Sequence, residues 1–99
     1  MKINKIPKGT LRTIVREVIS SAKNLGVRLD DIRAEMGERE GNVGSVHFSL
    51  DYKEFLINYF RREGEVVFCN VKEGEDKLVD KIYNIIGINH PGFTVCYVP

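Results

Sequence analysis

The chain has 99 residues, which gives room for one domain, residues 1–99, with a single hydrophobic core. Its composition, 42% hydrophobic and 29% charged, is that of a soluble globular protein, and no apolar run approaches the ~20 residues of a membrane span, so we expect no membrane segment. The formal net charge is +1, but residues 1–28 hold seven Lys or Arg and one Glu, whereas residues 29–99 hold eight Lys or Arg and thirteen Asp or Glu.

The first predicted element is a helix from about Thr10 to Asn24, preceded by a short basic lead-in over residues 1–8. Its apolar residues recur at helical spacing and would form one buried stripe. These residues are Leu11, Ile14, Val15, Val18, Ala22 and Leu25. Thr10 is a candidate N-cap, and Gly26 follows the last turn at the position where glycine commonly ends a helix.

Two antiparallel strands are predicted between residues 27 and 50, although a short helix is an alternative for the first of them. Both segments alternate apolar and polar residues. A pairing that sets Ala34 opposite Val46 also sets Ile32 opposite Phe48, which places both apolar sets on one face of the sheet. The polar, glycine-containing segment between them would be the hairpin loop.

For residues 52–63 we expect another helix, with a β-hairpin as the alternative. A helical stripe accounts for the large apolar side chains except Ile57. The stripe consists of Tyr52, Phe55, Leu56, Tyr59 and Phe60. Asp51 and Glu54 have the spacing of a capping box at its start. In the alternative, "FLINYF" and "VVFC" would be two strands joined by a turn at "EG".

The last third of the chain is predicted to hold a strand, a helix and a final strand. "EVVFCNV" is apolar on both faces, as a central strand would be. The segment "EGEDKLVDKIYNIIG" has a helical apolar stripe that would end at Gly87, and "FTVCYVP" follows as a strand. The fold class is therefore α+β in the order α-β-β-α-β-α-β, with a single mixed or antiparallel sheet of about four strands and three helices.

The two cysteines, Cys69 and Cys96, lie inside apolar stretches, where free buried thiols occur in a reducing compartment. We therefore expect a cytoplasmic, intracellular protein, and a Cys69–Cys96 disulfide is the less favoured alternative. The absence of Gln favours a thermophilic, thermostable protein, whereas the seven Asn residues argue against one.

The chain has no sequence motif for a cofactor, a metal or a catalytic mechanism. It lacks a phosphate loop, a dinucleotide-binding fingerprint and a CxxC pair, and its two His and two Cys residues have no ligand-pair spacing. We therefore expect no cofactor and no metal. His47, between Ser45 and Ser49, is the residue best suited to acid–base chemistry, but the sequence places no second catalytic group beside it.

The strongest candidate site is the basic side of the first helix. Lys8, Arg12 and Arg16 recur every four residues and Lys23 lies seven further on, so the four cations would share one face. Such a face would bind the phosphates of a nucleic acid or an acidic protein. The alternative is a solvated surface or one paired with acidic groups of its own fold, and no aromatic residues are interleaved with the cations.

These observations favour a small non-catalytic interaction or regulatory protein that binds a macromolecular partner, in a cell, a virus or a mobile element. Nucleic-acid binding through the first helix is the first alternative, and a small enzyme centred on His47 is the second. We also expect a homodimer. Nine aromatic residues and a strand apolar on both faces give more apolar surface than one sheet face and three helices would cover.

Overall fold

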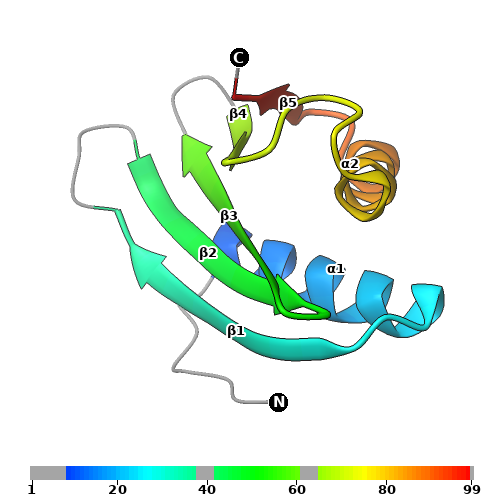
Figure 1. The fold of residues 1–99 in the computed structure, drawn as a ribbon. Coiled ribbons are helices and arrows are strands. Elements are labelled where there is room, and N and C mark those ends of the chain that lie inside the picture. Colours follow the sequence, from blue (N-terminus) through cyan, green and yellow to red (C-terminus); the bar gives the residue numbers. More distant parts are fainter. Residues whose placement is uncertain (1–8, 38–41, 61–64, 99) are drawn as a thin grey trace.

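The computed structural model describes residues 9–37, 42–60 and 65–98 of the chain. The elements in chain order are α1 (Thr10–Leu25), β1 (Leu29–Met36), β2 (Asn42–Leu50), β3 (Lys53–Phe60), β4 (Glu65–Cys69), α2 (Lys77–Asn89) and β5 (Thr94–Tyr97). The strands form one sheet in the order β1-β2-β3-β4-β5. The first four are antiparallel, and β5 returns through α2 to lie parallel to β4. The sheet curves around both helices, which lie on one of its faces (Figure 1). The α+β class with one mixed sheet is confirmed.

The predicted helix over residues 52–63 is wrong, and the hairpin alternative is what the chain forms. Residues 53–60 are β3, which pairs with β2 on one side and β4 on the other. Ile57, the residue that the helical stripe left outside, is fully buried, whereas Leu56 and Asn58 on either side of it are half-buried. Alternation with period two therefore describes this segment better than helical spacing. As a result, the described residues hold five strands and two helices instead of about four and three.

The β1–β2 pairing follows the predicted register. Ala34 lies opposite Val46 and Ile32 lies opposite Phe48, in an antiparallel ladder. Ile32, Val46 and Phe48 are all buried, so the shared apolar face is the one that the helices cover. The short-helix alternative for the first segment is thereby excluded.

The first helix ends as its sequence predicts but begins one residue earlier. Gly9, and not Thr10, occupies the N-cap position. At the other end Gly26 takes the left-handed conformation, with φ of 68°, and its N–H donates to the carbonyl of Lys23 at 3.2 Å. The N–H of Val27 donates to the carbonyl of Ala22 at 3.0 Å. These two hydrogen bonds form a Schellman motif, which turns the chain from α1 into β1.

The second helix is capped at its start by a carboxylate. Asp76 Oδ1 accepts hydrogen bonds from the N–H groups of Leu78 and Val79, at 2.9 and 3.4 Å. The predicted end at Gly87 is wrong, because the helix continues to Asn89 and His90 is its C-cap. Gly87 is therefore an interior helical residue.

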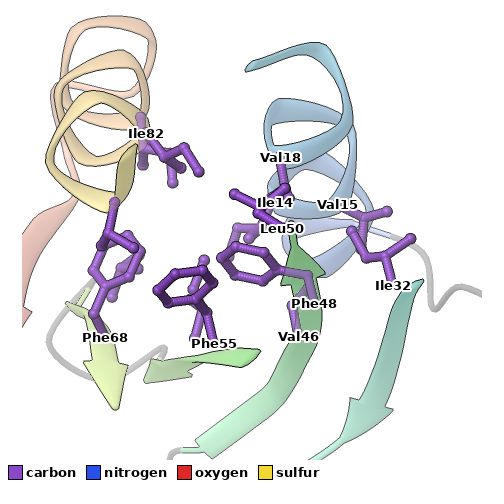
Figure 2. Packing of buried hydrophobic residues seen from close by; sticks show 14 of the residues in the cluster. Ile14, Val15, Val18, Ile32, Val46, Phe48, Leu50, Phe55, Phe68 and Ile82 are labelled. Atoms are coloured by element: carbon purple, nitrogen blue, oxygen red, sulfur yellow. The ribbon is translucent and has the colours of Figure 1, made fainter. Parts of the chain in front are cut away.

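The core lies between the two helices and the face of the sheet beneath them. Phe48, Phe55 and Phe68 from three neighbouring strands meet aliphatic side chains of α1 and α2 (Figure 2). At Gly44 of β2, the Leu11 side chain of α1 packs directly on the strand. A Cβ there would collide with the carbonyl oxygen of Glu35 and with the Leu11 side chain, so the packing of α1 requires glycine at this position.

No helix of the described chain covers the other side of the sheet, which we call the open face. One cross-strand row on it consists of Arg33, His47, Leu56 and Cys69. The neighbouring row consists of Glu35, Ser45, Asn58, Val67 and Cys96. Both cysteines are free thiols. Cys96 faces Val67 across the ladder and not Cys69, which explains why the alternative of a disulfide does not form.

Candidate functional site

The basic residues of α1 that the structure describes lie on the side of the helix away from the core. Arg16 and Lys23 are exposed and Arg12 is half-buried, whereas Val15 and Val18 are buried against the sheet. Helical geometry places these cations along one stripe. We call Arg12, Arg16 and Lys23 the α1 cationic face. Lys8, the fourth predicted member, lies outside the described residues.

The α1 cationic face has no acidic partner within the described part of the chain. The ion pairs among the described residues join Arg28 to Asp30, Lys53 to Asp76, and two histidines to glutamates. Glu17, the acidic residue of α1, points to the opposite flank. Its carboxylate accepts a hydrogen bond from Asn89 at 3.1 Å and lies 3.5 Å from His90 Nε2. The described acidic groups of the fold therefore leave the charge of these three cations uncompensated.

A second feature lies where β2 turns into β3, and the sequence reasoning missed it. Leu50 pairs with Lys53, so Asp51 and Tyr52 form a two-residue loop. Their φ angles are 47° and 68°, in the left-handed region that glycine and asparagine usually occupy in such turns. The capping-box spacing at Asp51 favoured a helix over this turn. The available signal was a polar residue pair between two alternating apolar runs.

Asp30 holds this loop in place. It is the extra residue of a β-bulge, because the β1–β2 register shifts between Leu29 and Asp31. Its carboxylate accepts hydrogen bonds from the Tyr52 N–H at 2.7 Å, from Arg28 Nε at 2.6 Å and from Ser49 Oγ at 3.4 Å. The backbone N–H of Tyr52, followed by Arg28, lowers the pKa of Asp30 below its usual value.

The Tyr52 ring is presented to solvent on this fixed loop. The residue is 80% exposed, and the Arg28 guanidinium carbon lies 4.2 Å from the ring centroid. This is the geometry of a cation–π contact on one face of the ring. The hydrogen bond from Arg28 to Asp30 raises the pKa of Arg28, so the guanidinium keeps its charge. Arg28 uses Nε for its hydrogen bond to Asp30.

On the open face, His47 lines a shallow pocket of about 170 Å³. Acidic, basic and polar groups line it together: Asp31, Arg33, Ser49, Glu54 and Asn70. His47 Nε2 also lies 3.6 Å from Glu35 Oε2. The sequence alone places no second catalytic group beside His47, but pairing of β1 with β2 brings carboxylates and an arginine to it.

The two hydroxyl groups that flank His47 in the sequence do not serve it. Ser45 Oγ donates to Asn58 Oδ1, and Ser49 Oγ donates to Asp30. A serine nucleophile activated by His47 is not formed in this arrangement. The Glu35 side chain is 59% exposed, so water competes with its contact to His47. The pocket therefore holds an acid–base group and carboxylates, without a serine hydroxyl that His47 could activate.

The two histidines lie in different parts of the fold. Among the described residues, no group of three His, Cys, Asp or Glu side chains is placed to hold a metal ion. His90 faces Glu17 between the two helices, whereas His47 lies on the open face.

None of the helices in the described ranges is long and apolar enough to cross a membrane. Comparison with known protein families, curated proteins and solved structures found no match to this chain.

Proposed function

We propose that this protein is a small non-catalytic interaction module that binds an acidic macromolecular partner through the α1 cationic face. The observation that supports the proposal is that Arg12, Arg16 and Lys23 have no acidic partner among the residues that the structure describes. Aligned cations without acidic neighbours create a local positive potential that attracts a polyanion. These three share one side of α1, and the carboxylate of that helix, Glu17, contacts Asn89 and His90 instead.

Charge of this kind makes binding depend on salt. Each nucleic-acid phosphate that is neutralised releases counterions, and the logarithm of the association constant falls by about 0.9 per phosphate for duplex DNA and about 0.7 for single strands, per unit of log salt. Fluorescence anisotropy with labelled oligonucleotides and with polyglutamate, between about 50 and 200 mM salt, measures this slope. We expect a slope of about −3 for a duplex that contacts three cations, and steeper if Lys8 contributes.

The decisive variant is the double substitution Arg12→Ala, Arg16→Ala. It should lower the slope by about two units for a duplex and weaken all sequences alike. Lys77→Ala, Lys81→Ala is the matched control, because it removes two exposed cations at the same spacing from α2. Equal effects of the two double variants, or no binding of any polyanion at low salt, would contradict the proposal.

A small enzyme centred on His47 is the second candidate function, favoured by the pocket that His47 shares with Asp31, Arg33 and Glu54. Chromogenic ester, phosphate and glycoside substrates test for an acid–base reaction. An activity that His47→Gln abolishes and His90→Gln retains would make the enzyme the better assignment. Absence of turnover in the wild-type protein would leave the pocket without a catalytic role for these substrates.

A homodimer and an intracellular location are further parts of the proposal. The open face, with half-buried Leu56, Phe60 and Val67, and the short edge strand β5 are the surfaces that would carry a dimer. The free thiols of Cys69 and Cys96 support a reducing compartment. A monomeric mass by light scattering at high micromolar concentration would contradict the dimer.

A further inference from the structure

The β2–β3 loop contains a backbone conformation that is disfavoured for the side chain it carries. A side chain with a Cβ is disfavoured at positive φ, and a two-residue hairpin loop of this kind usually contains Asn and Gly. Here the first position holds Asp51, which tolerates this conformation, but the second position holds Tyr52. Strained backbone of this sort persists where the surroundings fix it, and it gathers at binding and catalytic sites. The question is what the Tyr52 side chain provides that glycine would not.

Hydrogen bonds from the loop backbone to neighbouring residues fix the conformation of the loop at Tyr52. Asp30 accepts the N–H of Tyr52, and the carbonyl of Arg28 accepts the N–H of Asp51 at 3.0 Å. Arg28 itself is held by Asp30 and lies over the ring of Tyr52. One face of the ring is therefore covered by a positioned guanidinium, and the 80% exposure of the residue leaves the rest accessible. A rigid, exposed aromatic ring loses little freedom when it binds a partner.

The chain connects this ring to the C-terminal end of the α1 cationic face through Arg28. Lys23 is in the last turn of α1, and the Schellman motif passes the chain from there to Arg28 within five residues. The hydrogen bond between Asp51 and Arg28 ties the β2–β3 loop to that connection. The fold thereby supplies the aromatic group that is missing from the α1 sequence itself.

Two acids close to the loop in the fold or sequence have a basic partner. Arg28 neutralises Asp30, and Lys53 lies 3.4 Å from Asp76, which leaves Asp51 as the unpaired acid of the loop in the described chain. The ring is thus an exposed stacking surface backed by one cation, Arg28, on a loop that is tied to the connection following α1. A partner that fits both features carries flat rings and negative charges in alternation along one chain.

We propose that Tyr52, backed by Arg28, is a base-stacking platform, and that the partner is a single-stranded nucleic acid whose phosphates lie along the α1 cationic face. This inference rests on the function proposed above and names the partner class. Single strands offer unstacked bases that aromatic side chains bind without sequence preference, with arginine adding a cation–π contribution. Bases inside a duplex are already stacked on one another and would not reach the ring.

The test compares Tyr52→Asn and Tyr52→Phe in anisotropy titrations with an oligo-dT of about 12 nucleotides, a duplex of equal length and polyglutamate. Asn tolerates positive φ, so this variant keeps the loop and removes the ring. We expect Tyr52→Asn to weaken oligo-dT binding roughly 5- to 100-fold with an unchanged salt slope, and Tyr52→Phe to bind as the wild type does. Arg12→Ala, Arg16→Ala should instead lower the slope by about 1.4 units.

Each other outcome is distinct. If Tyr52→Asn binds oligo-dT as tightly as the wild type while the double arginine variant weakens it, the stacking platform is wrong and the α1 cationic face remains. Duplex binding as tight as single-strand binding also overturns the platform. Binding of polyglutamate alone identifies an acidic protein as the partner and overturns the nucleic-acid assignment. Failure of the wild type to bind any of the three at low salt overturns the proposed function together with this inference.

Discussion

The carboxylate of Asp30 lies 2.7 Å from the backbone nitrogen of Tyr52, 22 residues later in the chain. This hydrogen bond joins the bulge in β1 to the tip of the β2–β3 hairpin. The same hydrogen bond is the main cause of the lowered pKa of Asp30. It therefore determines the direction in which stability changes with pH at this residue.

Asp30→Asn should reduce the acid sensitivity of the fold. A carboxyl whose pKa is lower in the folded state contributes stability above its unfolded pKa of about 3.9, and that contribution disappears as the pH falls through the folded value. The difference in unfolding free energy between wild type and variant should therefore be largest near neutral pH and shrink below about pH 4. Urea unfolding from pH 2 to 7 measures it. Asp31→Asn is the control, and a constant difference across this range would contradict the prediction.

Substitutions of Tyr52 should reverse the usual order of glycine and alanine. At a φ of 68° a Cβ costs about 1–2 kcal/mol relative to glycine, so Tyr52→Gly should be more stable than Tyr52→Ala by about that amount. Both variants lose the contact with Arg28 equally. Thermal or urea unfolding compares them. Equal stability, or a more stable alanine variant, would show that the loop is not strained at this position.

Neighbouring residues of β3 should differ sharply in their response to alanine. Ile57→Ala should cost about 2–5 kcal/mol, because Ile57 is fully buried between sheet and helices. Leu56→Ala removes a similar volume from the half-exposed open face and should cost less than about 1 kcal/mol in the monomer. Urea unfolding at low protein concentration measures both. Similar losses would argue against the strand, or for an open face that is covered.

Two glycines should respond to alanine in opposite directions. Gly44→Ala should destabilise the protein by about 1–3 kcal/mol, since the new Cβ meets the carbonyl of Glu35 and forces Leu11 of α1 away from β2. Gly87→Ala should stabilise it by about 0.5–1 kcal/mol, because Gly87 is inside α2 and nothing lies within 4 Å of its Cβ position. Calorimetry of the two variants measures the difference in sign. A stabilised Gly44→Ala would mean that α1 does not pack closely on β2.

The parts of the fold that the sequence predicts are those where one local pattern decides. Apolar residues at helical spacing define α1, and strict alternation fixes the pairing of Ile32 with Phe48. The helix predicted over residues 52–63 is wrong because the aromatic residues there fit both a helical stripe and an alternating strand. Ile57 separates the two patterns, since a strand buries it and the helix does not.

The two candidate sites differ in the same way. Helical spacing alone aligns Arg12, Arg16 and Lys23, so the α1 cationic face is readable from the sequence. The Asp30–Tyr52 contact depends on a bulge and on the pairing of strands distant in sequence, which no local pattern contains. The pocket at His47 arises for the same reason, because Arg33 and Glu54 reach it only through the sheet.

The order of the strands has a consequence for how the molecule assembles. β1 to β4 follow one another as a meander, and α1 packs on the two strands that come directly after it, so most pairing joins segments close in sequence. Only β5 reaches its partner through a crossover, and it pairs over four residues. Local pairing favours fast folding, and detaching a short terminal strand costs less free energy than opening any other part of a sheet. Backbone amides of β5 should therefore exchange with solvent hydrogen well before those of β2 and β3, which lie inside the meander with a paired strand on each side.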